Sequence, residues 1–307
     1  MGHEIDITNG KTVLTAPKGL SAFQLKVIAL VIMTVDHIGA FAFEIPLVMR
    51  NQSYLRAVGR LAMPIFLFLL VQSIRHTRSK RRFILRLYLA GMGTELFVTA
   101  MNLLFGDRFR YFTPGNIIFT FFYTALYTVL IERLIESVRE KQWRTLGLCV
   151  LGLALSLVPT VIYLPLLDGV YSLNGSDRMT FLLEGLLNSV VPSFYLMDYG
   201  IGAVILGVVM YFAGTKKRQC IVYAVFCALC IAGRIAGSFG VDFDRIPSFG
   251  FFETFFDYSQ NRMIWALPFM LLYNGQRGRP CKWFFYWYYP VHRELIWLFT
   301  QVFFPLG

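Results

Sequence analysis

Nine apolar segments recur along the 307-residue chain, and the stretches between them are short, polar and mostly basic. Each segment is about long enough to cross a ~30 Å hydrocarbon core as a helix, although the eighth is short. A chain with 56% hydrophobic residues is also incompatible with an ordinary soluble domain. The sequence therefore predicts an all-α polytopic membrane bundle, with eight to ten spans possible and nine favoured at 23–43, 54–74, 83–105, 114–131, 146–166, 198–213, 220–240, 261–275 and 283–304.

The distribution of basic residues predicts how the bundle is oriented. The formal net charge of +11 reflects basic clusters between apolar segments, as expected of cytoplasmic loops rather than of a nucleic-acid-binding surface. All the clusters fall on one side if 179–197 is a partial or interfacial helix on the outer side. We therefore expect a multi-pass protein of the plasma (inner) membrane with a cytoplasmic N-terminus, an external C-terminus and an external excursion over 167–197. Residues 1–22 would form a cytoplasmic tail without a cleavable signal, and 23–307 a single transmembrane domain.

The first apolar segment carries an acid and an imidazole side by side, at Asp36 and His37. Ionisable groups at membrane depth are costly, so by default they indicate a pathway, a partner or a reaction. Lys26 lies eleven residues before His37. At about 100° per residue both side chains leave the same helix face, about 16 Å apart along the axis. One face therefore carries a cation at the membrane boundary and a titratable ring near the midplane.

Leu25-Lys26 and Asp36-His37-Ile38-Gly39 open a pattern that continues in order over nearly the whole chain. This pattern resembles the TraX family of membrane proteins, which are N-terminal acetyltransferases of conjugative pilin. A more distant resemblance is to the family-3 membrane acyltransferases, whose first helix carries an arginine where Lys26 stands here, so the bidentate fork of that arginine is lost. The later matching segments are Arg56, Gly59-Arg60 and Pro64-Ile65-Phe66; His76-Thr77 and Arg86-Leu87; Asp198-Tyr199-Gly200; Tyr273-Asn274-Gly275 and Gly278; and Lys282, Phe285-Tyr286 and Tyr289-Pro290 with His292.

His37 is the best candidate for a general base, because an imidazole titrates near neutrality and can take a proton from an attacking amine or hydroxyl. The alternative is a buried histidine that only bonds a neighbouring helix. Asp36 needs a partner other than His37, since adjacent helical residues point about 100° apart. We predict that Asp36 pairs with Arg60 across antiparallel helices, which would neutralise two charges at similar depth. His292, about 15 Å beyond Lys282, is a second catalytic candidate near mid-depth, as the resemblance also implies.

The basic loop that follows the second span has two interpretations. Membrane topology alone would explain it. The more specific hypothesis is that it binds acetyl-CoA, because clustered guanidinium and ammonium groups at a membrane boundary suit the 3′-phosphate and the pyrophosphate of coenzyme A. No metal is expected, since Cys227-x-x-Cys230 lacks a second pair of ligands. The predicted donor-binding residues are Lys26, Arg75, His76, Arg78, Lys80, Arg81, Arg82 and Arg86.

These observations predict an integral-membrane acetyltransferase that moves acetyl from cytoplasmic acetyl-CoA to an amine or a hydroxyl. Direct transfer is favoured over a covalent acyl-enzyme, because no cysteine or serine stands out beside His37. The resemblance implies a pilin-like peptide N-terminus as acceptor, while a glycan or lipid-linked acceptor stays open. A transporter or solute-binding protein is the alternative, with Asp36, His37, Arg60 and His292 forming a proton or solute path. A structural partner of a secretion apparatus would leave the buried acid and histidine unexplained.

Overall fold

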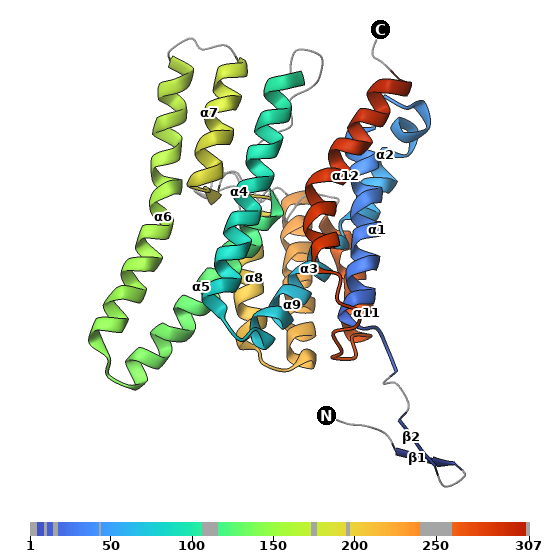
Figure 1. The fold of residues 1–307 in the computed structure, drawn as a ribbon, viewed down its shortest axis with the longest axis vertical. Coiled ribbons are helices and arrows are strands. Elements are labelled where there is room, and N and C mark those ends of the chain that lie inside the picture. Colours follow the sequence, from blue (N-terminus) through green and yellow to red (C-terminus); the bar gives the residue numbers. More distant parts are fainter. Residues whose placement is uncertain are drawn as a thin grey trace.

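The structure is a computed structural model that describes residues 5–8, 11–14, 18–42, 44–105, 116–172, 177–194, 197–239 and 260–304. A small antiparallel hairpin of β1 (Ile5–Thr8) and β2 (Lys11–Leu14) lies in the predicted tail and projects away from the bundle (Figure 1). The rest of the described chain is helical, as predicted. Its helices are α1 (Ala22–Phe41), α2 (Pro46–Gly59), α3 (Ala62–His76), α4 (Lys80–Phe105), α5 (Ile117–Arg139), α6 (Trp143–Ser172), α7 (Asp177–Val190), α8 (Gly200–Phe212), α9 (Lys216–Ser238), η3 (Gln260–Ala266), α11 (Leu267–Leu271) and α12 (Lys282–Phe303).

Six spans in the described part of the chain are long and apolar enough to cross a membrane, so the molecule is a helical membrane protein. They are α1, α2 together with α3, α4, α5, α6 and α9. The predicted count of nine is therefore not confirmed. The predicted span 198–213 is the 13-residue α8, and 261–275 is made of the short η3 and α11. The predicted span 283–304 is the 22-residue α12.

The second span differs most from its prediction. A continuous helix over 54–74 was wrong, because α2 and α3 together cover Pro46 to His76 and are separated at Arg60 and Leu61. Pro64 explains the break, since it has no N–H to donate to the carbonyl of Arg60 four residues earlier and is tolerated only in the first turn of the new helix. Arg60 consequently lies at a helix boundary within the membrane.

The predicted partial helix at 179–197 corresponds to the 14-residue α7. In Figure 1, α7 runs from the upper end of the bundle to about mid-height, and α8 continues from there to the lower end. The two helices share one crossing, with a turn at Tyr199 and Gly200, both at positive φ. Part of the predicted external excursion, 173–176 and 195–196, lies outside the described residues.

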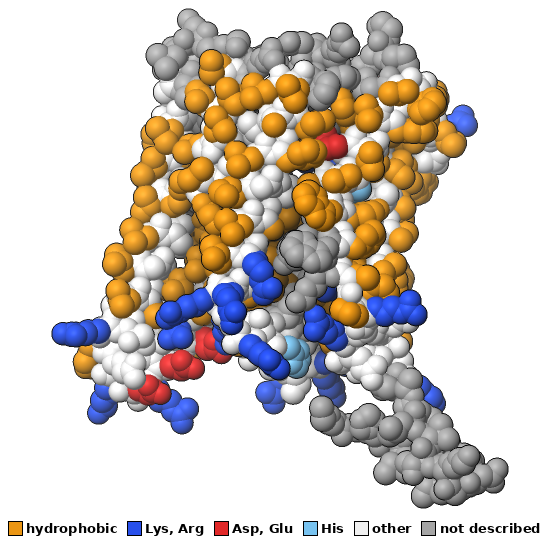
Figure 2. Space-filling model, in the orientation of Figure 1, with side chains coloured by type: hydrophobic (Ala, Val, Ile, Leu, Met, Phe, Trp, Pro, Cys, Tyr) orange, Lys and Arg blue, Asp and Glu red, His pale blue; other side chains and the backbone are white. Residues whose placement is uncertain are grey.

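Basic residues gather at the end of the bundle where α1 begins. The α3–α4, α5–α6 and α8–α9 connections all lie at this lower end (Figure 1), and Figure 2 shows Lys and Arg side chains along the lower edge of that face. This arrangement agrees with the prediction that the basic loops share one side of the membrane. That this side is cytoplasmic stays a prediction.

Burial separates the core of the bundle from its lipid-facing part. In the most apolar window of each span, 67% of the residues are buried for α2–α3 but only 11% for α6. Leu67, Phe68 and Val71 of α3 are completely buried. The start of α1 is fixed as well, by a capping box at Ser21 and by a backbone bond between Leu20 and Leu272. α3 is therefore the central helix, and α1 packs against it in a defined position.

Cysteine labelling tests the orientation. Cys281 is exposed before α12, while the other four cysteines are buried. The native Cys281, and cysteines introduced at Arg78, Arg139 and Lys217 in a Cys281→Ser background, should all react with a membrane-impermeant maleimide from the cytoplasmic side only. A Met179→Cys control at the start of α7 should react from the other side. Labelling of both Lys217→Cys and the native Cys281 from outside, with Arg78→Cys and Arg139→Cys still labelled from the cytoplasm, would show that 179–197 crosses the membrane completely.

Candidate active site

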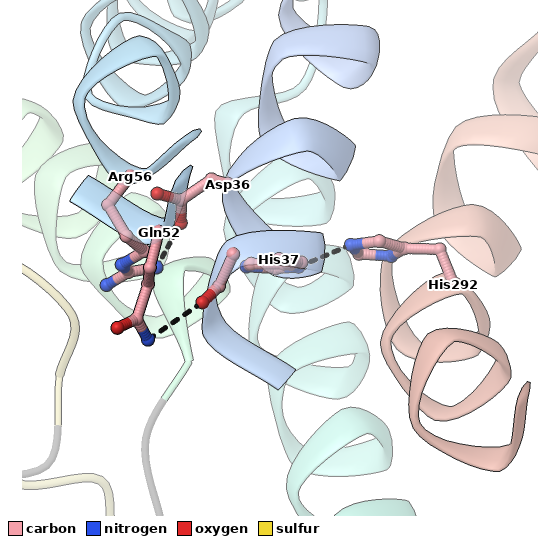
Figure 3. A network of polar contacts seen from close by, with 6 residues as sticks. Asp36, His37, Gln52, Arg56 and His292 are labelled. Carbon is pink, nitrogen blue, oxygen red and sulfur yellow. Dashed lines mark hydrogen bonds and ion pairs between the residues drawn. The ribbon is translucent and has the colours of Figure 1, made fainter. Parts of the chain in front are cut away.

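α1 presents Asp36 and His37 to two different neighbours. The helix packs against both α2 and α12. Figure 3 shows Asp36 directed toward α2 and His37 directed toward His292 on α12. This divergence agrees with the expected separation of about 100° between adjacent helical residues. The two side chains therefore have separate partners, although they are neighbours in the sequence.

His37 and His292 form a direct contact between α1 and α12. Nδ1 of His37 lies 2.5 Å from Nε2 of His292, and the rings stack with 4.7 Å between centroids at an angle of 11°. His292 is buried and His37 is partly buried. Phe41, one turn farther along α1, lies edge-on to the His37 ring at 5.4 Å. The structure thus brings the two predicted histidines together, while their roles stay a prediction.

Asp36 pairs with Arg56 of α2. Arg56 Nη1 lies 2.6 Å from Asp36 Oδ2. The predicted ion pair with Arg60 was therefore wrong, because the depth of Arg60 was counted along a continuous helix from Arg75 and the helix breaks at Arg60. Arg60 still interacts electrostatically with Asp36 and with Tyr199. Arg56 lies one helical turn before Arg60, on the same side of the helix. A prediction based on helical spacing could therefore have named Arg56 as the partner of Asp36 equally well.

Asp198 approaches the same region from the turn before α8. Its carboxylate lies near the backbone N–H of Ile117 at the start of α5, which donates to the Tyr289 hydroxyl at 3.3 Å, and it interacts electrostatically with Arg56, Arg60 and Arg293. Asp198 is exposed, and it lies where α8 begins, near mid-height (Figure 1). Asp198 therefore borders a space at this depth that the neighbouring side chains do not fill.

These side chains form one mid-depth polar cluster beside the histidine pair. The sequence had identified Asp36 and Arg60 as site residues, and Asp198 and Tyr199 only as part of the family pattern. It did not single out Arg293, which directly follows His292 in the sequence. Arg293 interacts electrostatically with both His37 and Asp198. The members of the mid-depth polar cluster are Asp36, Arg56, Arg60, Asp198, Tyr199 and Arg293.

Two of the predicted donor-binding residues make contacts inside the bundle. Arg75 donates to the backbone carbonyl of Tyr211 and lies over its ring at 5.0 Å. Lys80 forms an ion pair with Glu132 and donates to the Tyr211 hydroxyl at 3.3 Å. These contacts join α3, α4, α5 and α8 at the lower end, so both residues hold the loop in place. Lys80 is partly buried, whereas Arg75 is exposed, as are His76, Arg78, Arg81, Arg82 and Arg86 of the predicted set.

Lys26 lies on the side of α1 that meets α12. Its Nζ is 5.4 Å from the centre of the Phe285 ring, and Phe285 belongs to the same helix as His292. The predicted common face of Lys26 and His37 is therefore the face that packs against α12. Because Lys26 is near the start of α1 and His37 near its end, this seam leads from the basic lower end to the histidine pair.

Metal binding has no support in the part of the chain that the structure describes. No group of three or more His, Cys, Asp or Glu side chains there could hold a metal ion. Cys227 and Cys230 are buried, unpaired thiols within α9. They fill space in the core around Tyr223.

Comparisons with known proteins agree with the resemblance seen in the sequence. A family model described as "TraX protein" matches residues 21–300. The "Probable fimbrial assembly protein FimC, serogroup H1" of Dichelobacter nodosus is 36% identical over 104 residues. That alignment covers 33% of this chain and 42% of the relative, so the match spans less than half of either protein. No solved structure matches the chain.

Close packing of Asp36 against Gly59 predicts the effect of a single methyl group. A Cβ at Gly59 would lie 2.1 Å from Asp36 Cβ and Oδ1, so Gly59→Ala must move the acid and should cost roughly 1–3 kcal/mol of stability. Gly93→Ala in α4 is the control, because nothing lies within 4 Å of its Cβ. That variant should be neutral or more stable by up to about 1 kcal/mol. Equal melting temperatures for the two purified variants would contradict the close approach.

Proposed function

Because the chain belongs to the TraX family, we propose that it is an integral-membrane acetyltransferase that uses cytoplasmic acetyl-CoA. The observation that carries the proposal is the His37–His292 contact at mid-depth, in line with Lys26 at the basic end. The acceptor is an amine or hydroxyl of a membrane-associated or external molecule. A pilin-like peptide N-terminus is favoured, since the family acts on pilin and the FimC relative is named as a fimbrial assembly protein.

His37 is the general base of the proposed reaction. It takes a proton from the attacking amine or hydroxyl while that atom bonds to the thioester carbonyl carbon. The C–S bond then breaks, and the coenzyme A thiolate leaves and recovers a proton from His37. The transfer is direct, as expected from the sequence, and acetyl never bonds to the protein. A base at this position lies beside the mid-depth polar cluster, since the partly buried His37 interacts electrostatically with Arg56 and Arg293.

The mid-depth polar cluster contributes electrostatically to this reaction. A negative charge develops on the thioester carbonyl oxygen when the acceptor attacks, and fixed cationic groups in a water-poor site stabilise such a charge strongly. Arg56, Arg60 and Arg293 supply three guanidinium groups near Asp36 and Asp198, and Arg293 also forms an ion pair with Glu294 at 3.5 Å. Nε of Arg60 is buried and has no hydrogen-bond partner among the described residues. Arg60 therefore retains a donor for a substrate oxygen.

The exposed basic residues of the α3–α4 loop hold the phosphates of the donor. With Arg75 and Lys80 fixed by Tyr211 and Glu132, the loop presents its remaining cations to solvent in a constant geometry. Lys26 adds a cation at the start of the α1–α12 seam. The interval from Lys26 to His37, about 16 Å, is comparable to the reach of an extended pantetheine arm. Phosphates at the lower end would thus leave the thioester beside the imidazole.

Donor binding tests the loop. Replacing Arg78, Arg81 and Arg82 together by Gln should weaken acetyl-CoA binding to the detergent-purified protein by roughly 10-fold or more, because three exposed charge contacts contribute up to about 1 kcal/mol each. The salt dependence of binding should decrease with them. The matched control replaces Arg139, Lys141 and Arg144, which lie at the exposed α5–α6 connection at the same end. Equal affinity of the two triple variants would leave the loop with a topological role only.

The roles of His37 and Lys26 predict opposite kinetic effects. His37→Ala should leave acetyl-CoA binding nearly intact and lower single-turnover transfer by about 10² to 10⁴, the usual contribution of a positioned base. Lys26→Ala should weaken donor binding by up to about tenfold, or ~1 kcal/mol, and leave the transfer step nearly unchanged. The comparison requires variants that melt like the parent. Normal transfer by a folded His37→Ala protein would remove the base assignment and strengthen the transporter alternative.

A further inference from the structure

The proton positions on the histidine pair follow from one hydrogen bond of His292. Its Nδ1 lies 2.8 Å from the backbone carbonyl oxygen of Tyr288, one turn earlier on α12. A carbonyl oxygen can only accept a hydrogen bond, so Nδ1 of His292 must carry a proton. In the neutral ring the other nitrogen, Nε2, then has a lone pair and accepts. This nitrogen is the one that faces His37.

The short contact between the rings then fixes the proton on His37. Nδ1 of His37 lies 2.5 Å from Nε2 of His292, so it must be the donor of that hydrogen bond. Nε2 of His37 is left with a lone pair, and it points away from His292 because the two ring nitrogens face different directions. A doubly protonated His292 would reverse the bond. In that alternative a positive charge would lie on the buried His292 ring. Arg293, the next residue in the sequence, would repel this charge.

We infer that His292 is a positioning residue that holds His37 as the Nδ1–H tautomer, so that Nε2 is the atom that takes the acceptor's proton. This inference rests on the proposed acetyltransferase function, and it assigns different roles to two histidines that residue type alone cannot distinguish. The proton from the acceptor goes to Nε2 of His37. The positive charge of the imidazolium is shared with His292 through the short bond, and the same proton returns to the departing thiolate. No other oxidant, reductant or co-reactant is needed.

Contacts on both helices hold His292 in this orientation. The Tyr288 ring stacks on the His292 ring at 5.0 Å and 9°. The Tyr288 hydroxyl lies 2.6 Å from Thr34 Oγ1, which donates its own proton to the carbonyl of Leu30 at 2.8 Å. The tyrosine is therefore the donor to Thr34, and α1 and α12 are joined one turn from the histidine contact. Tyr288 thus orients His292 twice, through its carbonyl and through its ring.

Two substitutions at His292 separate positioning from catalysis. His292→Gln keeps a carbonyl oxygen that can accept from His37 Nδ1, so single-turnover acetyl transfer should stay within about fivefold of the parent, allowing ~1 kcal/mol for altered geometry. His292→Leu removes the acceptor and should lower transfer by roughly 10- to 10²-fold. This loss is smaller than the about 10⁴ seen when a base is locked in the wrong tautomer, because a released ring still samples the correct one. Acetyl-CoA affinity should change little in either variant.

The tautomer itself gives a readout that does not depend on activity. In protein labelled with ¹⁵N-histidine, His37 should show a protonated Nδ1 and an unprotonated Nε2 in the parent and in His292→Gln, and a mixture of tautomers in His292→Leu. Assignment uses the His37→Ala and His76→Ala spectra. An Nε2–H tautomer of His37 in the parent overturns the inference. Equal loss of transfer in His292→Gln and His292→Leu also overturns it, since the imidazole of His292 would then be the base. A parent with these tautomers but no acetyl transfer would reject the proposed function alone.

Discussion

The Asp36–Arg56 ion pair is the constraint on which the arrangement of the site depends. Only 13% of the Asp36 side chain and 32% of the Arg56 side chain are exposed, so each charge needs the other as a partner at this depth. A contact of 2.6 Å requires α1 and α2 to lie close together. Two glycines allow this approach, because a Cβ at Gly39 would lie 2.8 Å from Leu55 Cβ and one at Gly59 would overlap Asp36. With Asp36 committed to α2, the next residue on α1, His37, necessarily faces a different helix.

Interrupted helices create the polar interior around that pair. α3 begins after the break at Arg60, α5 begins at its cap Asn116, and α8 begins after Asp198. The side chain of Asn116 caps two N–H groups of α5, and Asp198 lies near the N–H of Ile117, which donates to the Tyr289 hydroxyl. Helix N-termini carry partial positive charge and favour nearby carboxylates. Irregular backbone at membrane depth is tolerated only within protein or along a solvated space, which agrees with the exposure of Asp198.

The sequence-based predictions were correct where they depended on the geometry of a single helix. The 3.6-residue period placed Lys26 and His37 on one face, and that face does meet α12 through Phe285 and His292. Spacing along one helix does not reveal where that helix breaks or which helices are neighbours. The ion pair of Asp36 was therefore assigned one turn too far, at Arg60. The sequence also could not show that Arg75 and Lys80 of the basic loop contact other helices.

A neutral histidine is a suitable orienting group for the base proposed at His37. A carboxylate beside His37 would orient the ring and stabilise its cation, but it would add a further buried negative charge that needs its own partner. Asp36 points away from His37 because the two residues are adjacent on α1. Its charge is neutralised by Arg56 instead. His292 accepts one hydrogen bond and donates another to the backbone of Tyr288, which leaves its ring fully paired without any net charge. The membrane environment therefore favours a pair of imidazoles where a soluble enzyme would more readily use an acid and an imidazole.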